Sequence, residues 1–191
     1  EILSMLILVT IYIIAALLLA VYAFNTWVLT ALYFRYRHKT PTLPPLEEDV
    51  PSVTVQLPIF NEALVVERLI EAILRLDYPT DRLQIQVLDD STDLTTQIAQ
   101  ARVDYYCQQG FNIELIHRTD RTGFKAGALK KGLETATGEF IAIFDADFVP
   151  RPDFLKQTVP YFRLQPQIGL LQTRWGHLNR NYSWLTAAQA L

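Results

Sequence analysis

The sequence predicts an α/β domain built on a mostly parallel sheet and preceded by one transmembrane helix. Three observations lead to this fold class. No charged residue occurs from Ile2 to Phe34, and from Ser52 onward short apolar runs alternate with segments of helical period. Polar residues directly follow several of these runs. A sheet with crossover helices produces this alternation, and the 191 residues leave room for a domain and a membrane span.

The charge-free N-terminal segment has the length of a membrane span. A bilayer core about 30 Å thick requires about 20 consecutive apolar residues, and this segment exceeds that length. A cleaved signal peptide fits less well, because the segment is too long, lacks a basic lead and shows no clear small-residue cleavage site. Residues 1–36 are therefore predicted to form a transmembrane helix.

Basic residues follow the predicted span directly: Arg35, Arg37, His38 and Lys39. Because positive residues stay on the cytoplasmic side, the sequence predicts an integral membrane protein with the rest of the chain in the cytosol. The single Cys107 agrees with a reducing compartment, since it allows no intrachain disulfide. Residues 37–51, rich in proline and acidic side chains, are predicted to be a cytosolic linker that leads to a domain over residues 52–191.

The charge balance excludes one class of partner. The chain has 17 basic and 20 acidic residues, so it offers no basic footprint for nucleic acid. We therefore expect no nucleic-acid partner.

The expected elements of the domain follow from its apolar pattern. Five runs are predicted to be strands: Val53–Leu57, Ile85–Leu88, Ile113–Ile116, Phe140–Phe144 and Ile168–Gln172. The segments between them carry three predicted buried helix stripes: Val66, Leu69, Ile73 and Leu76; Leu94, Ile98, Ala101 and Tyr105; and Ala126, Leu129, Leu133 and Ala136. Parallel sheets bind ligands at the carboxyl ends of their strands, so the residues after each run are the candidates for chemistry.

Two acidic residues, Asp145 and Asp147, directly follow the run Phe140–Phe144. Paired carboxylates at a strand end can hold a hard divalent cation such as Mg²⁺ or Mn²⁺, which is often shared with a substrate's phosphates. Aspartate is also common in turns and helix caps. The position after a core strand favours the metal site. His117 has no second histidine at metal-ligand spacing, so we expect it to be an ordinary strand residue.

A second acidic cluster, Asp89, Asp90 and Asp93, follows the run Ile85–Leu88. A carboxylate at this strand exit can accept hydrogen bonds from a base or a ribose. A side chain within Ser91–Asp93 is also expected to cap the next helix, which explains one aspartate and not three.

A third candidate site surrounds Lys125, where Gly123 and Gly127 flank a predicted helix start. Backbone N–H groups and the positive helix end suit a phosphate, and the lysine adds a point charge. A solvated surface position is the less favoured alternative for Lys125, Arg118 and Arg121. No G-x-G-x-x-G follows a strand and no G-x-x-x-x-G-K-[ST] occurs, which excludes the common dinucleotide-binding and phosphate-loop motifs.

Four motifs in this order resemble the processive glycosyltransferases of family two: Pro58-Ile-Phe-Asn61-Glu62, Val87-Leu-Asp89-Asp90-Ser-Thr-Asp93, Lys125-Ala-Gly-Ala-Leu129 and Phe144-Asp145-Ala-Asp147. Within that family the sequence is most similar to the cellulose-synthase-like enzymes that make β-mannan, glucomannan or xyloglucan backbones. The likeness covers residues 52 to about 190.

The resemblance implies a GT-A fold and an inverting transfer of a hexose from UDP-glucose, GDP-mannose or a similar donor to a growing β-glycan. It implies Mg²⁺ or Mn²⁺ on Asp145 and Asp147. It also implies a set of substrate-binding residues: Pro58, Asn61, Glu62, Asp89, Asp90, Lys125 and Asp145. The family's carboxylate general base has no counterpart before Leu191, so we expect it beyond that residue and expect residues 52–191 to be an incomplete, nucleotide-binding part.

Two other functions remain open from the sequence. A glycolipid synthase that transfers sugar to diacylglycerol or ceramide shares the strand-end motifs and the anchor, and its acceptor is a lipid instead of a glycan. A membrane-anchored nucleotide-binding module without catalysis is the third possibility, since the general base is missing. All three have the membrane as a partner, and the two enzymes use a nucleotide-sugar donor.

Overall fold

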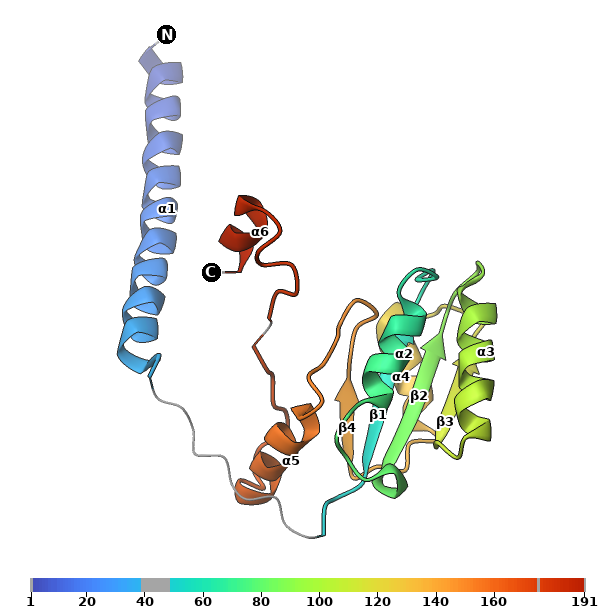
Figure 1. Cartoon of the computed structure of the whole chain (residues 1–191). Helices are drawn as coiled ribbons and strands as arrows, with labels where there is room; N and C mark the ends of the chain where they lie inside the picture. Colours follow the sequence, from blue (N-terminus) through green and yellow to red (C-terminus); the bar gives the residue numbers. More distant parts are fainter. Residues whose placement is uncertain (1, 39–48, 175, 191) are drawn as a thin grey trace. The chain divides into compact units, whose positions relative to one another are not determined.

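The computed structural model describes residues 2–38, 49–174 and 176–190 (Figure 1). Its contacts divide the chain into two units, Glu1–Thr42 and Leu43–Leu191, which are described separately below. Most of the predicted linker, residues 39–48, lies outside the described residues.

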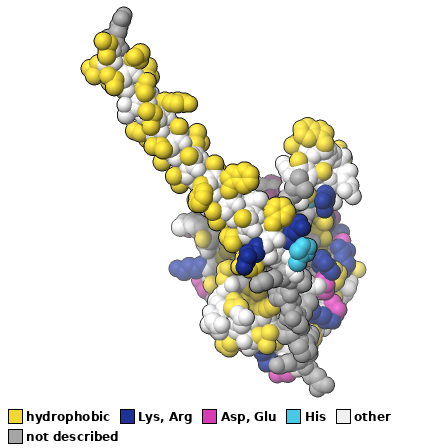
Figure 2. Space-filling view, turned by 90° about the vertical axis from the view of Figure 1, so that its left-hand side faces the viewer, with side chains coloured by type: hydrophobic (Ala, Val, Ile, Leu, Met, Phe, Trp, Pro, Cys, Tyr) yellow, Lys and Arg dark blue, Asp and Glu magenta, His cyan; other side chains and the backbone are white. Residues whose placement is uncertain are grey.

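The first unit consists of helix α1, Ile2–Tyr36, with 35 residues. At 1.5 Å rise per residue such a helix is about 52 Å long, more than a bilayer core about 30 Å thick. None of its residues is buried, and Figure 2 shows hydrophobic side chains along its visible face. The predicted apolar N-terminal helix is therefore confirmed, and its length and composition make it a candidate for a membrane span.

The second unit contains the predicted parallel sheet. Its strands are β1 (Val53–Ile59), β2 (Leu83–Asp89), β3 (Ile113–His117) and β4 (Phe140–Ile143). Their order is β3-β2-β1-β4, and all neighbouring pairs are parallel. The carboxyl ends of all four strands therefore lie at one edge of the sheet.

The helices between the strands cover both faces of the sheet, and, among the described residues, two further helices follow the last strand. They are α2 (Val66–Leu74), α3 (Thr95–Gln108), α4 (Phe124–Leu133), α5 (Phe154–Leu164) and α6 (Trp184–Gln189), with a 3₁₀ turn at Thr80–Arg82. Helices α2 and α3 lie on one face and α4 on the other (Figure 1). Helix α5 packs on the face of α2 through its aromatic rings, with Phe162 stacked on Phe140 at 4.9 Å between centroids.

The two faces of the sheet differ in chemistry because each strand alternates its side chains. The face under α2 and α3 is apolar, and its buried side chains include Val55, Leu57, Ile85 and Val87. The face under α4 is polar, with buried Thr54, Gln56, Gln84 and Gln86. Burial of apolar surface against α2 and α3 stabilises the domain, whereas the second face depends on hydrogen bonds.

The predicted fifth strand, Ile168–Gln172, is not a strand. These residues have no regular secondary structure, and the side chain of Leu170 is 78% exposed. A strand requires a hydrogen-bonded neighbour, and the described sheet ends at β4. An apolar run alone therefore did not determine a strand.

Two predicted helix stripes were also wrong in part. On α3 the side chains of Leu94 and Tyr105 are 63% and 53% exposed, and the buried stripe is Thr95, Ala99 and Val103. Hydrophobicity favoured the leucine, which lies just before the helix. The methyl-bearing threonine one residue later faces the core.

Helix α4 buries Ala128 and Gly132 instead of the predicted stripe, and the side chain of Leu133 is 55% exposed. A Cβ atom at Gly132 would lie 2.6 Å from Gln56 Nε2, so only small residues fit between α4 and the sheet.

Candidate functional site

The loops that follow β1 and β2 are joined at the carboxyl edge of the sheet. Asn61 donates its backbone N–H to Ser91 Oγ at 2.9 Å, and its side-chain Oδ1 accepts the N–H of Thr92 at 2.9 Å. Asn61 has a φ of 55°, in the left-handed region that asparagine tolerates better than most residues. The predicted site residue Asn61 therefore fixes two loops relative to each other.

Asp89, the last residue of β2, has no exposed surface. Its carboxylate accepts hydrogen bonds from Ser91 N at 2.9 Å and Thr96 Oγ1 at 2.6 Å, and His117 Nδ1 lies 2.9 Å from Oδ2. Burial raises the pKa of this carboxyl, but these hydrogen bonds outweigh it and hold the pKa below its usual value. In this structure Asp89 has no exposed atom that could contact a ligand. Its hydrogen bonds instead stabilise the carboxyl edge of the sheet.

Asp90 forms a bidentate ion pair with Arg118. Arg118 donates Nε to Oδ1 at 2.7 Å and Nη2 to Oδ2 at 2.5 Å, and the carboxylate side chain is 5% exposed. The hydrogen bonds from Arg118 to Asp90 raise the pKa of the guanidinium. Arg118 Nη2 also donates to the carbonyl of Phe124 at 3.1 Å, so this pair fixes the following loop. Next to it, the Asp93 carboxylate accepts the N–H of Thr95 at the start of α3.

An arginine and an aromatic ring meet at the end of β1. The Arg121 guanidinium carbon lies 3.3 Å from the ring centroid of Phe60 and 5.3 Å from that of Phe124. Phe124 has a φ of 49° and follows Gly123 with a φ of 76°. Strained backbone of this kind occurs preferentially at functional sites. In the described part of the chain the non-glycine residues with positive φ are Asn61 and Phe124, both at this edge.

Lys125 and Asp145 form an ion pair at the end of β4. Their side chains are 51% and 46% exposed, so the pair is open to solvent and to a ligand. Asp147 is exposed nearby in the sequence. Lys125 is the second residue of α4, whose N-cap is Gly123. The positive end of this helix thus lies close to the carboxylate predicted to hold a metal.

Arg118, Arg121 and Lys125 lie in one segment, residues 118–125, which we call the crossing segment, and His117 directly precedes it. His117 at the end of β3 contacts Asp89, Arg118 contacts Asp90, and the later cations contact Phe60 after β1 and Asp145 after β4. The contacts follow the order of the strands in the sheet. The structure therefore brings Asp90, Lys125 and Asp145 to one edge, as the sequence predicted.

Two predicted site residues lie beside this edge without side-chain contacts to it. Pro58 is half-buried near the end of β1, opposite Leu88 of β2. Glu62 is exposed, and its carbonyl accepts the N–H groups of Val65 and Val66. Both positions are compatible with a ligand lying across the loop after β1.

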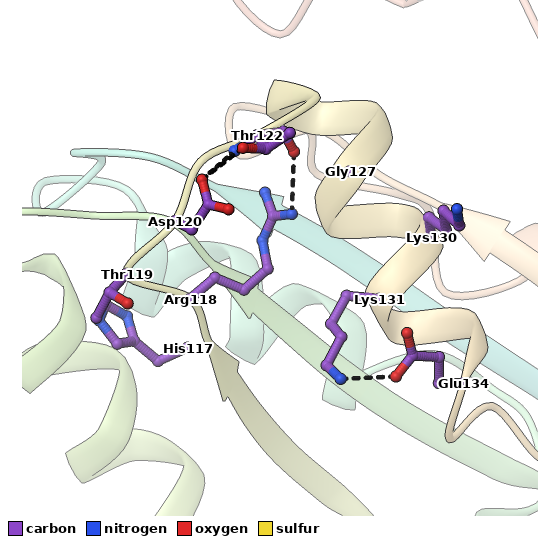
Figure 3. A pocket seen from close by; sticks show the side chains of 9 residues that line it. All are labelled: His117, Arg118, Thr119, Asp120, Thr122, Gly127, Lys130, Lys131 and Glu134. Carbon is purple, nitrogen blue, oxygen red and sulfur yellow. Dashed lines mark hydrogen bonds and ion pairs between the residues drawn. The ribbon is translucent and has the colours of Figure 1, made fainter.

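A hollow with a volume of about 450 Å³ lies beside the crossing segment. Figure 3 shows Arg118 between the loop of Asp120 and Thr122 and helix α4. Lys131 pairs there with Glu134, and Asp120 accepts hydrogen bonds from Thr122. Its charges are mostly paired, and its lining does not include Asp145 or Asp147, so this hollow is distinct from the predicted donor site.

The acidic pair fits a shared metal site better than a complete protein cage. Among residues 2–38, 49–174 and 176–190 no cluster of three or more His, Cys, Asp or Glu side chains has the geometry to hold a metal. Mg²⁺ and Mn²⁺ are commonly bound by one or two carboxylates, with substrate phosphates and water supplying the other ligands. Asp145 and Asp147 carry carboxylate oxygens, the type of ligand that such an ion prefers.

Comparison with known proteins decides the family. The family model described as glycosyl transferase family 2 matches residues 54–189. The chain belongs to glycosyl transferase family 2. The GT-A fold implied by the sequence is therefore confirmed.

Several family members resemble the chain closely. A probable glucomannan 4-beta-mannosyltransferase 7 from Oryza sativa subsp. japonica is 44% identical over 147 residues, which cover 75% of this chain and 25% of the relative. Glucomannan 4-beta-mannosyltransferase 2 from Arabidopsis thaliana is 40% identical over 175 residues, covering 86% and 33%. The chain thus spans a quarter to a third of these relatives.

Solved structures agree with this assignment. Mannosyltransferase PcManGT from Pyrobaculum calidifontis, in complex with GDP-Man and Mn²⁺, is 33% identical with a TM-score of 0.62 and covers 75% of this chain and 42% of that one. The S. aureus protein TarS 1-349 is 20% identical with a TM-score of 0.53, covers 66% of this chain and 39% of that one, and supports the fold alone.

Sequence reasoning missed two contacts at this edge, the bidentate Arg118–Asp90 pair and the Arg121–Phe60 stack. The basic residues were considered as candidates, but the sequence does not distinguish a solvated arginine from one that fixes a loop. The signal was their spacing. Cations at 118, 121 and 125 fall within one short segment that must cross the ends of several strands.

Proposed function

We propose that this chain is the donor-binding part of a membrane-anchored, inverting glycosyltransferase that transfers a hexose from a nucleotide sugar to a growing β-glycan. Family membership supports sugar transfer from a nucleotide donor. The glucomannan mannosyltransferases named above favour a glycan acceptor over a lipid acceptor and favour GDP-mannose over UDP-glucose.

The observation that carries the proposal is the convergence of charges on one edge of the sheet. Lys125 and Asp145 meet at the end of β4, and Arg121 lies over Phe60 at the end of β1. A nucleoside diphosphate presents a planar aromatic base and an anionic diphosphate. Basic side chains at a helix N-terminus suit the anion, and a carboxylate beside them suits its bound cation.

We assign the following roles to the residues of the site. Asp145 and Asp147 hold Mn²⁺ or Mg²⁺, which supplies Lewis-acid stabilisation of the departing nucleoside diphosphate. Lys125 binds the diphosphate, and Asn61 keeps the loops after β1 and β2 in place for the nucleoside. Asp90 lies at the base end of the site, held by Arg118. Pro58 and Glu62 line the nucleotide.

Calorimetry tests donor binding directly. The full chain in detergent is titrated with GDP and with UDP in the presence of Mn²⁺, and we expect tighter binding of GDP. Asp145→Asn and Asp147→Asn should each abolish the metal-dependent part of binding. Asp104→Asn on α3 is the matched control, because Asp104 is exposed and its carboxylate accepts a hydrogen bond from Gln100 on the same helix. Binding unaffected by either site variant would refute the proposed site.

The anchor is tested separately. We propose that α1 spans the membrane and that residues 52–191 lie in the cytosol, on the strength of its length, its apolar surface and the basic residues that follow. Resistance of the chain to carbonate extraction is the expected result. A cysteine-reactive, membrane-impermeant reagent added to intact cells should leave the exposed Cys107 unlabelled. Labelling of Cys107 in intact cells would place the domain on the other side.

A further inference from the structure

The face of the sheet under α4 carries a buried polar network. Thr54 donates to Gln84 Oε1 at 2.7 Å and Gln56 Nε2 donates to Gln86 Oε1 at 3.0 Å, linking β1 to β2. Gln84 and Gln86 also donate from Nε2 to Glu114 Oε1 on β3, each at 3.1 Å. Burying amides is unfavourable unless they are hydrogen-bonded, and in this network they are.

The same network holds the chain that leaves α4. Gln86 Nε2 donates to Thr135 Oγ1 at 2.9 Å, and Gln84 Nε2 donates to the carbonyl of the same residue at 3.0 Å. Gln84 Oε1 accepts the N–H of Thr137 at 2.8 Å, and Thr54 Oγ1 accepts the N–H of Gly138 at 2.8 Å. Directional contacts therefore fix the C-terminal side of α4 to β1 and β2.

Helix α4 lies directly on these amides. A Cβ atom at Gly132 would lie 2.6 Å from Gln56 Nε2 and 3.0 Å from Gln86 Oε1. The residues that α4 buries are Ala128 and Gly132, and one apolar side chain, Leu88 with its Cδ2 2.9 Å from the same Cβ position, lies beside the amides there. Apolar contact is non-directional, whereas hydrogen bonds define distance and angle. The glutamines thus determine the height and register of α4 on the sheet.

The N-terminal end of the same helix carries Lys125, the residue paired with Asp145. Seven residues separate Lys125 from Gly132, about 10 Å along a helix at 1.5 Å per residue. A short rigid helix transmits a shift at one end to the other. We propose that Gln56 and Gln86 are positioning residues for donor binding, which act through α4 to place Lys125 against the diphosphate. This inference rests on the proposed function.

Two variants test the positioning role from different directions. Gln86→Leu removes the hydrogen bonds beneath the helix, and Gly132→Ala pushes the helix away from Gln56. We expect each to weaken binding of GDP with Mn²⁺ by about tenfold, since displacements near 1 Å remote from the chemistry can cost up to about a hundredfold. Thr135→Val should act in the same direction and Thr135→Ser should bind as the wild type, because only serine keeps the hydroxyl that Gln86 contacts.

A control separates positioning from stability. Ile73→Val removes one methylene group from the fully buried apolar face, on α2. It should lower the melting temperature and leave nucleotide affinity unchanged. If Ile73→Val weakens binding as much as Gln86→Leu at an equal loss of melting temperature, the positioning role is refuted.

A double-mutant cycle identifies the route. In a Lys125→Ala background, Gln86→Leu and Gly132→Ala should have almost no further effect on affinity, since the residue through which they act is gone. Full additivity would overturn the inference, as would wild-type affinity in all three single variants at Gln86, Gly132 and Thr135 while Lys125→Ala binds weakly. Absence of GDP or UDP binding by the wild-type chain would instead refute the proposed function, so the two failures are distinguishable.

Discussion

Two pairs of acidic residues follow strands of the same sheet, and the structure treats them in opposite ways. Asp89 and Asp90 at the end of β2 are buried, and each carboxylate is saturated by hydrogen bonds from neighbouring residues. Asp145 at the end of β4 is 46% exposed and pairs with the half-exposed Lys125, and Asp147 is exposed. The first pair stabilises the edge of the sheet from within, and the second pair is open to solvent.

The comparison shows that position at a strand end does not by itself make a carboxylate a ligand-binding group. The two pairs of carboxylates differ in how many hydrogen-bond donors of the domain lie within reach. Ser91, Thr96 and Arg118 reach the β2 pair, whereas the β4 pair lies where the sheet ends in the described part of the chain. A carboxylate whose ion-pair partner is a solvent-exposed lysine at a helix N-terminus stays accessible to a bound cation.

The largest effect should come from the exposed pair. Asp145→Asn combined with Asp147→Asn is expected to reduce Mn²⁺-dependent nucleotide binding by at least about a hundredfold, since the two carboxylates are the proposed metal ligands. Its free energy of unfolding should stay within about 0.5 kcal/mol of the wild type, as for most exposed substitutions. Calorimetry and urea denaturation of the same preparation measure both. A large loss of stability would show that this pair also builds the fold.

The buried pair should show the reverse pattern. Asp89→Ala leaves the hydroxyl of Thr96 and the N–H of Ser91 without their acceptor, so we expect a loss of about 3 kcal/mol in the free energy of unfolding. Nucleotide affinity, measured where the variant is folded, should change much less than in the Asp145 variants. Wild-type stability would contradict the structural role.

The pH dependence of stability should carry the signature of Asp89. Its pKa is lower in the folded chain than in the unfolded chain, where it is about 3.9. The folded state therefore gains stability from this carboxylate above that value and loses it as the pH falls through the folded pKa. Urea midpoints from pH 6 to pH 3 should converge for the wild type and Asp89→Asn as the pH falls. Parallel curves would rule out Asp89 as the source.

The smallest effect concerns the lysine that neutralises Asp145. Lys125→Met removes a competing cation, so binding of Mn²⁺ without nucleotide should tighten by about threefold, whereas binding of GDP should weaken. Metal titration followed by electron paramagnetic resonance measures the first quantity. Weaker metal binding in this variant would mean that Lys125 supports the site in a way other than charge.

Much of the fold could be predicted because the apolar residues of the elements concerned are buried at the spacing that their secondary structure requires. The runs that became β1 to β4 are bounded by turn residues, and Val66, Leu69 and Ile73 of α2 are buried as their spacing predicted. Ile168–Gln172 failed because a strand also needs a neighbour to pair with. The polar face was not predicted, because glutamine in a strand usually indicates a solvent-exposed position. Gln56 and Gln86 are instead buried and hydrogen-bonded to each other, which only the structure shows.

The site was predictable to the level of residues and not of contacts. Motif order placed Asp90 and Asp145 after strands and Lys125 at a helix start, and parallel topology then brought them to one edge. That Arg118 saturates Asp90 depends on the path of the loop after β3, which the pattern of apolar residues does not encode.

Residues 118–125 have one further consequence, for how this region tolerates change in length. Neighbouring strands are about 4.8 Å apart, and the side chains at 118, 121 and 125 each meet the end of a different strand. Inserting or deleting a single amino acid there would misalign every later pairing at once. The length of this segment therefore matches the width of the sheet, and we expect its number of residues to be more tightly constrained than their identities.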